Sequence, residues 1–111
     1  RYITKEVVLE DPATSLRIMI SVYKPPGSEI SVYYKTKSTD SSSYRHLRYV
    51  NVPQLADFDK MVSVSEDEWF EFEYDVSDIL EFTSFGIKLV LRADNSSYVP
   101  MVRDLRVIAT S

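Results

Sequence analysis

Apolar side chains recur at every second position along much of this chain, which is the period of a β-strand with one buried face. No stretch longer than one turn shows the 3.6-residue period of a helix. Turn-forming residues separate the alternating segments. This pattern predicts an all-β protein in which short strands build two packed sheets. The segments with strand periodicity are, in order, 2–9, 16–23, 29–35, 44–52 (weaker), 68–76, 85–91 and 101–110.

The predicted fold is an antiparallel two-sheet β-sandwich, jelly-roll-like, with about eight strands. The length of 111 residues suits one domain, 1–111, with a radius of gyration of roughly 13 Å. The prolines and glycine of 25–28 separate segments 16–23 and 29–35, which we expect to be consecutive antiparallel strands. Residues 37–43 read as a polar loop. The one helical element expected is a single turn over 77–81, with Ser77 as its N-cap.

Composition excludes several classes of function. The absence of cysteine rules out disulfide scaffolds, thiol catalysis and cysteine-based zinc sites, and the single histidine, His46, rules out any site that needs two imidazoles. The net charge of -4 argues against a nucleic-acid-binding surface. No apolar run approaches the ~20 residues of a membrane helix. We therefore expect neither a nucleic acid nor a membrane as partner.

Candidate catalytic and metal-binding residues are weak. Glu71 and Glu73 would lie roughly 7 Å apart on one strand face, a spacing compatible with glycoside hydrolysis. Acidic residues on the solvent face of any strand look the same. Asp57 and Asp59 could contribute to a calcium site, but they lack the looped pattern of such sites. We expect no catalytic residue, no metal site and no cofactor, and we expect His46 to be an exposed strand or loop residue.

Three aromatic residues fall where a sandwich core does not place them. Alternation puts Trp69 with the acidic side chains rather than with Phe70 and Phe72. It would stack a sugar ring, supply a hot spot to a subunit contact, or enter the core through a β-bulge. Tyr23 and Tyr33 point outward on consecutive strands, where cross-strand packing is the alternative to a binding role. Arg106 alternates away from the core and is available for a partner.

Several segments are similar to a known family. The sequences TSFGIKLVL (83–91), NSSYVP (95–100) and RDLRVIAT (103–110) resemble a block in large virion proteins of contractile-tailed bacteriophages. The opening RYITK (1–5), a polar turn near Asp11-Pro12 and the segment 23–35 match as well. Together these segments cover about half of the chain, in the expected order.

The resemblance implies a non-catalytic structural module of a phage particle, in its tail, baseplate or neck. Its partners would be other virion proteins or copies of itself. The chain starts at Arg1 without methionine, so we expect a domain excised from a larger virion protein. The absence of cysteine suits a virion component assembled in the reducing host cytoplasm. The alternative is a carbohydrate-binding or host-attachment module of a tail protein, which would bind a host surface glycan through Trp69, Tyr23 and Tyr33.

Overall fold

The computed structural model of the chain describes residues 1–38 and 43–111 and has the predicted all-β sandwich architecture. Two 3-10 turns, Tyr44–His46 and Phe58–Lys60, are the helical elements of the described residues. The strands are β1 (Tyr2–Ile3), β2 (Val7–Ala13), β3 (Ser15–Tyr23), β4 (Ser28–Lys37), β5 (Val50–Asn51), β6 (Phe70–Val76), β7 (Phe82–Ala93) and β8 (Met101–Thr110).

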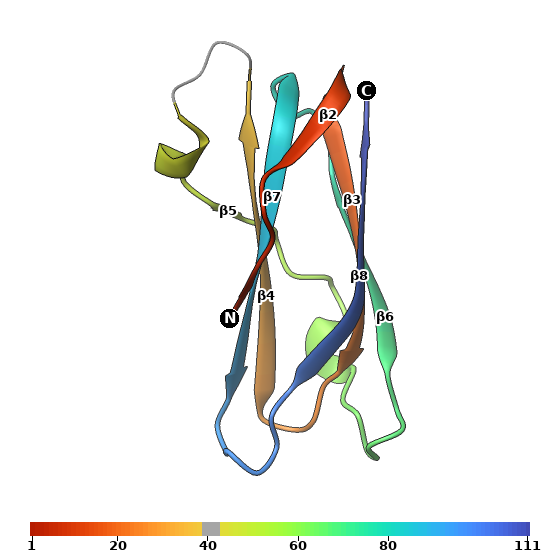
Figure 1. Cartoon of the computed structure of the whole chain (residues 1–111). Helices are drawn as coiled ribbons and strands as arrows, with labels where there is room; N and C mark the ends of the chain where they lie inside the picture. Colours follow the sequence, from red (N-terminus) through yellow and green to blue (C-terminus); the bar gives the residue numbers. More distant parts are fainter. Residues whose placement is uncertain (39–42) are drawn as a thin grey trace.

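The strands form two antiparallel sheets that pack face to face (Figure 1). In the five-stranded sheet the order is β1-β7-β4-β5, and β2 also pairs with β7; in the three-stranded sheet the order is β6-β3-β8. The pairs β2–β7, β3–β6 and β4–β5 are nested in sequence. Such nesting wraps the chain as a jelly roll does, so the predicted fold class is confirmed.

The core lies between the sheets, and the alternation of the sequence determines which side chains enter it. The residues of β3 at even positions, Leu16 to Val22, are at most 2% exposed. On the facing sheet, Phe85, Ile87 and Leu89 of β7 are also buried. Phe58, from the second 3-10 turn, closes the core against Phe72 with ring centroids 5.2 Å apart. The long strands β3 and β7 therefore bury the face that they turn toward the other sheet, as their period of two requires.

The expectation that segments 16–23 and 29–35 are neighbouring strands is wrong in its pairing. β3 pairs with β6 and β8, whereas β4 pairs with β5 and β7 in the other sheet. The turn between them carries the chain across the sandwich: Pro25 is buried, and the Ser28 hydroxyl donates to the Pro25 carbonyl at 2.6 Å. Gly27 adopts a φ of 75°, which its missing side chain permits.

Three local expectations need correction. The segment 44–52 is a 3-10 turn followed by the two-residue strand β5, and the opening 2–9 is divided between β1 and β2. No helical turn forms at 77–81, because Asp78 has a φ of 57°, outside the right-handed helical region. There the Ile79 N–H donates to the Thr14 carbonyl instead. Most of the predicted polar loop, residues 39–42, lies outside the described part of the chain.

The sandwich is elongated. Its principal extents are 46 × 24 × 21 Å, and its radius of gyration is 15.1 Å, above the roughly 13 Å of a more spherical domain of this length. Within the residues described, there is no helix of the length and apolar character needed to cross a bilayer.

Candidate interaction surface

The outer face of the three-stranded sheet brings together two of the predicted binding residues, Trp69 and Tyr23. Trp69, just before β6, lies beside Tyr23 at the end of β3, with 6.0 Å between ring centroids. The Arg103 guanidinium of β8 lies over the indole, 4.0 Å from its centroid. Trp69 is half-buried in this contact. Its ring is outside the core, as alternation predicts, and a neighbouring side chain already covers one of its faces.

Charge divides this outer face into an acidic strand and a basic strand. The acidic residues belong to β6: Glu71, Glu73 and Asp75. The basic residues Arg103 and Arg106 belong to β8, and β3 lies between these two strands. The Arg17 Nε of β3 lies 2.9 Å from Asp75 and 3.9 Å from Glu73. These partners are all more than half exposed, so the pairs contribute little to stability. The hydrogen bond to Asp75 and the two carboxylate charges raise the pKa of Arg17.

Tyr33 lies away from Tyr23 and Trp69. It belongs to β4, opposite Lys88 of β7, on the outer face of the five-stranded sheet. The expectation that Tyr23 and Tyr33 lie side by side is therefore wrong, because their strands belong to different sheets. The two tyrosines point to opposite outer faces of the sandwich and cannot form one platform.

A layer of tyrosines and lysines covers the outer face around Tyr33. The Lys88 ammonium lies 4.6 Å from the Tyr33 ring centroid and 4.7 Å from that of Tyr49. Lys35 lies 4.0 Å from the Tyr44 ring centroid, and its ammonium donates to the Tyr44 carbonyl at 3.0 Å. Burial of the Tyr44 hydroxyl is the main reason that its pKa is raised to about 12. The layer is closed by the chain's own side chains, so it offers little to a partner.

The layer depends on Gly86. A Cβ at this position would overlap the Tyr44 hydroxyl, which lies over the backbone of β7. The sequence does not reveal this layer by itself. The sequence does contain its parts: Tyr33 and Lys35 occupy outward positions of 29–35, and a tyrosine lies on each side of Leu47. The pairing that brings these segments together is not visible in the sequence.

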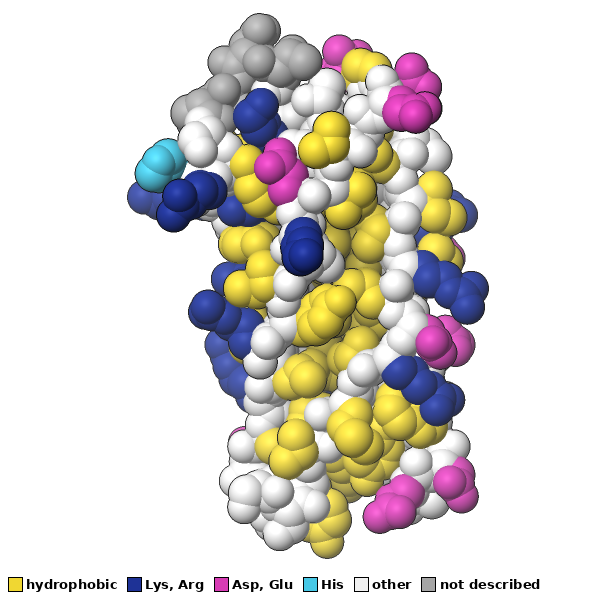
Figure 2. All heavy atoms as spheres, viewed as in Figure 1, with side chains coloured by type: hydrophobic (Ala, Val, Ile, Leu, Met, Phe, Trp, Pro, Cys, Tyr) yellow, Lys and Arg dark blue, Asp and Glu magenta, His cyan; other side chains and the backbone are white. Residues whose placement is uncertain are grey.

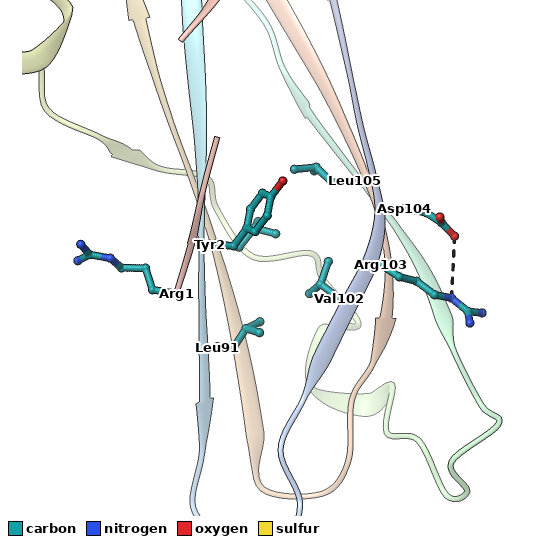
Figure 3. Close-up of a pocket in the computed structure, with 8 residues that line it drawn as sticks. Arg1, Tyr2, Leu91, Val102, Arg103, Asp104 and Leu105 are labelled. Carbon is teal, nitrogen blue, oxygen red and sulfur yellow. Dashed lines mark ion pairs between the residues drawn. The ribbon is translucent and has the colours of Figure 1, made fainter. Parts of the chain in front are cut away.

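One side of the sandwich is open. In Figure 2, hydrophobic side chains form a continuous strip between the edges of the two sheets. A groove of about 280 Å³ lies there between β1–β7 and β8. Figure 3 shows the Tyr2 ring, Leu91, Val102 and Leu105 around it, whereas the ion pair of Arg103 and Asp104 lies on the other side of β8. Tyr2 is 53% exposed. We call the surface lined by Tyr2, Leu89, Leu91, Val102 and Leu105 the open groove.

The groove is exposed because no described segment covers the core-facing side of β8 at its free edge. Its core-facing residues (Val102, Leu105, Val107 and Ala109) are all half-buried, whereas the core-facing residues of β3 are fully buried. The sequence pattern does not reveal this surface. Strict alternation from Leu105 would place Val102 outward with Arg106. A β-bulge brings Val102 back to the inner face, because Asp104 and Leu105 both face Ile20 of β3.

The remaining candidates stay isolated. His46 is exposed at the end of the first 3-10 turn, and Asp57 and Asp59 are exposed beside the second. Glu71 and Glu73 are exposed on the outer face of the three-stranded sheet. Among residues 1–38 and 43–111, no group of three or more acidic or histidine side chains is placed to hold a metal ion.

Comparisons of the chain with protein-family models, with curated proteins and with solved structures found no match.

Proposed function

We propose that the chain is a non-catalytic assembly module that contacts other protein subunits, in the particle of a contractile-tailed bacteriophage. The observation that supports it is the open groove. Exposed apolar side chains that are contiguous, rather than scattered, are typical of interaction sites. Tyr2, Val102 and Leu105 lie together there, and charged residues such as Arg103 lie at its margin. An apolar centre with a polar rim is the usual anatomy of a protein interface.

The virion context comes from the resemblance of the sequence to virion proteins. The physical properties of this domain suit a component of a phage particle. A particle component needs a rigid body and a surface complementary to its neighbours, and a β-sandwich with a buried core supplies the first. The exposed edge strand β8 supplies a place for the second.

The alternative is a carbohydrate-binding or host-attachment module. The contact of Trp69 with Tyr23 favours it, because paired aromatic rings on a sheet face suit a sugar ring. Two observations weigh against it. Arg103 covers one face of the indole at 4.0 Å, and Tyr33 lies on the opposite side of the molecule. A glycan would have to displace the guanidinium or use the remaining face of the ring.

Site-specific photo-cross-linking tests the assembly function. The chain has no cysteine, so Tyr2→Cys offers one attachment point for a benzophenone in the open groove. Val64→Cys is the matched control, because Val64 is 86% exposed and does not line the groove. We expect adducts with other virion proteins from Tyr2→Cys when the labelled chain is present during particle assembly, and none from Val64→Cys. Equal labelling at both positions, or no adduct, would contradict the proposal.

Tryptophan fluorescence tests the alternative, since Trp69 is the chain's one tryptophan. We expect its emission to stay unchanged on titration with polysaccharides. A saturable shift in emission, abolished by Tyr23→Ala, would favour the glycan function instead.

A further inference from the structure

The strand pairing of this jelly roll leaves one pair unmade. The nested pairs β2–β7, β3–β6 and β4–β5 would be completed by an outermost pair of the first and last strands. β1 instead pairs with β7, with Tyr2 opposite Leu89 and Ile3 opposite Lys88. Within the described chain, β8 has a single neighbour, β3. The place beside β8 where the nesting expects a strand is empty.

The vacant edge is long, and it is apolar on one side. β8 has ten residues, which is enough for a full strand partner. One edge of β8 bonds to β3, so the N–H and C=O groups of its other edge point away from the sheet. A strand added there would cover the half-exposed core-facing residues of β8 and the open groove below them.

We infer that β8 accepts an extended segment of another protein as a fourth strand of its sheet. The segment would carry apolar side chains on its core-facing side and acidic side chains on its outer side. This inference rests on the proposed assembly function and specifies the chemistry of the partner.

The charge of the outer face argues for acidic residues in the added strand. Arg103 and Arg106 project from β8 on that face, and Arg106 makes no ion pair with any described residue. Side chains of an added strand would lie directly across from them, about 5 Å away. The acidic residues of β6 are three strand spacings from the added strand, roughly 14 Å, which exceeds the screening length at physiological salt. Asp104 offsets Arg103, whose guanidinium lies over Trp69, so Arg106 is the cation of β8 that has no partner among the described residues and sets the charge of this edge.

A second copy of the chain fits the edge less well. Two-fold pairing of β8 with β8 would bring Arg103 and Arg106 of one chain beside those of the other, with only one Asp104 each to offset them. Like charges opposite each other destabilise strand pairs. Both strands would also carry the bulge at Asp104 into the same seam, and bulges disrupt ladder hydrogen bonds. A strand of a different protein brings neither a second bulge nor further arginines to the seam.

A designed peptide tests the inference. The probe is a capped, fluorescently labelled peptide of about nine residues that alternates Glu with Val. Its matched controls are the same peptide with Lys in place of Glu, and the Glu peptide with alternate backbone amides methylated. We expect the Glu peptide to bind by fluorescence anisotropy and both controls to bind at least about tenfold more weakly.

Variants and hydrogen exchange locate the site. Arg106→Glu should weaken binding of the Glu peptide about tenfold and strengthen that of the Lys peptide, whereas Arg48→Glu, the same change of charge elsewhere on the surface, should do neither. Amide hydrogen exchange should slow in β8 when the Glu peptide is bound. Equal binding of the three peptides, or protection confined to other strands, would overturn the inference. So would self-association through β8, or full protection of its outer edge in the free chain.

This outcome is separable from that of the assembly function. Cross-linking from Tyr2→Cys in the particle without peptide binding would leave the assembly function in place and remove the added strand. Peptide binding without any cross-link in the particle would support the added strand and contradict the assembly function.

Discussion

Single residues determine which side chains pack on the outer faces of the two sheets. Gly86 leaves room for the Tyr44 ring over β7, and Lys35, only 7% exposed, lies against the same ring. On the other sheet, Arg103 covers one face of Trp69. In both places a cation lies over an aromatic ring, an arrangement that strengthens as water is excluded. These contacts hold connecting segments and edge strands to the sandwich.

The fit of Tyr44 over Gly86 gives a residue-scale prediction. Gly86→Ala should lower the free energy of unfolding by about 1–3 kcal/mol, because the new methyl group displaces a packed ring. Urea denaturation measures this difference. In a Tyr44→Ala background the same glycine substitution should cost close to nothing, since the ring it meets is gone. Equal costs in the two backgrounds would show that Tyr44 does not occupy this position.

Among the secondary-structure elements, β8 is an edge strand that carries a β-bulge. Its bulge places Val102 and Leu105 on the inner face although three positions separate them. Asp104, in the bulge, has a φ of 55°. Aspartate tolerates this left-handed conformation better than most residues with a side chain. The bulge also interrupts the regular hydrogen-bond ladder, so two copies of β8 would pair poorly with each other.

Substitutions at Asp104 test the bulge. Asp104→Val should destabilise the chain by about 1–3 kcal/mol, because a β-branched residue strongly resists a positive φ. Asp104→Asn and Asp104→Gly should stay within about 1 kcal/mol of the parent, since both adopt this conformation. The lost ion pair with Arg103 is exposed and contributes little. Thermal or urea unfolding checks the order, and equal stability of the Val and Asn variants would contradict it.

At the scale of the whole molecule, the sandwich is closed on one side and open on the other. Around β3 and β7 the core is fully buried, whereas between β1 and β8 it reaches the surface (Figure 2). The nested pairing explains this difference, because its outermost pair is absent. The molecule therefore has a buried core and, beside β8, an edge at which apolar side chains are left uncovered.

The stability of the whole molecule should fall at alkaline pH. Burial raises the pKa of Tyr74 to about 12, and that of Tyr44 to about 12, from about 10 in an unfolded chain. The folded state therefore holds these protons more tightly, so the stabilisation is complete below pH 10 and is lost as the pH rises toward 12. Denaturation midpoints across this range measure the loss. Tyr74→Phe, which removes the hydroxyl that donates to Gln54, should flatten the decline; an unchanged slope would contradict this cause.

The all-β class, the positions of the long strands and the face that each of them buries follow from the alternation in the sequence. The even positions of 16–22 and the odd positions of 85–89 are buried as their alternation predicts, because period two is a local property of an extended chain; Leu91, at the end of the second series, is half-buried. Alternation also places Trp69 and Arg106 outside the core.

Which strands are neighbours is visible only in the folded molecule. Alternation is the same whichever strand lies alongside, so it could not show that β3 and β4 belong to different sheets, or that Tyr23 and Tyr33 therefore diverge. The short elements also could not be predicted from the sequence. At 77–81, for example, Asp78 adopts a left-handed conformation and the expected helical turn does not form. The open groove depends on the missing neighbour of β8. Such a vacancy arises from contacts between residues far apart in the chain, and no local pattern records it.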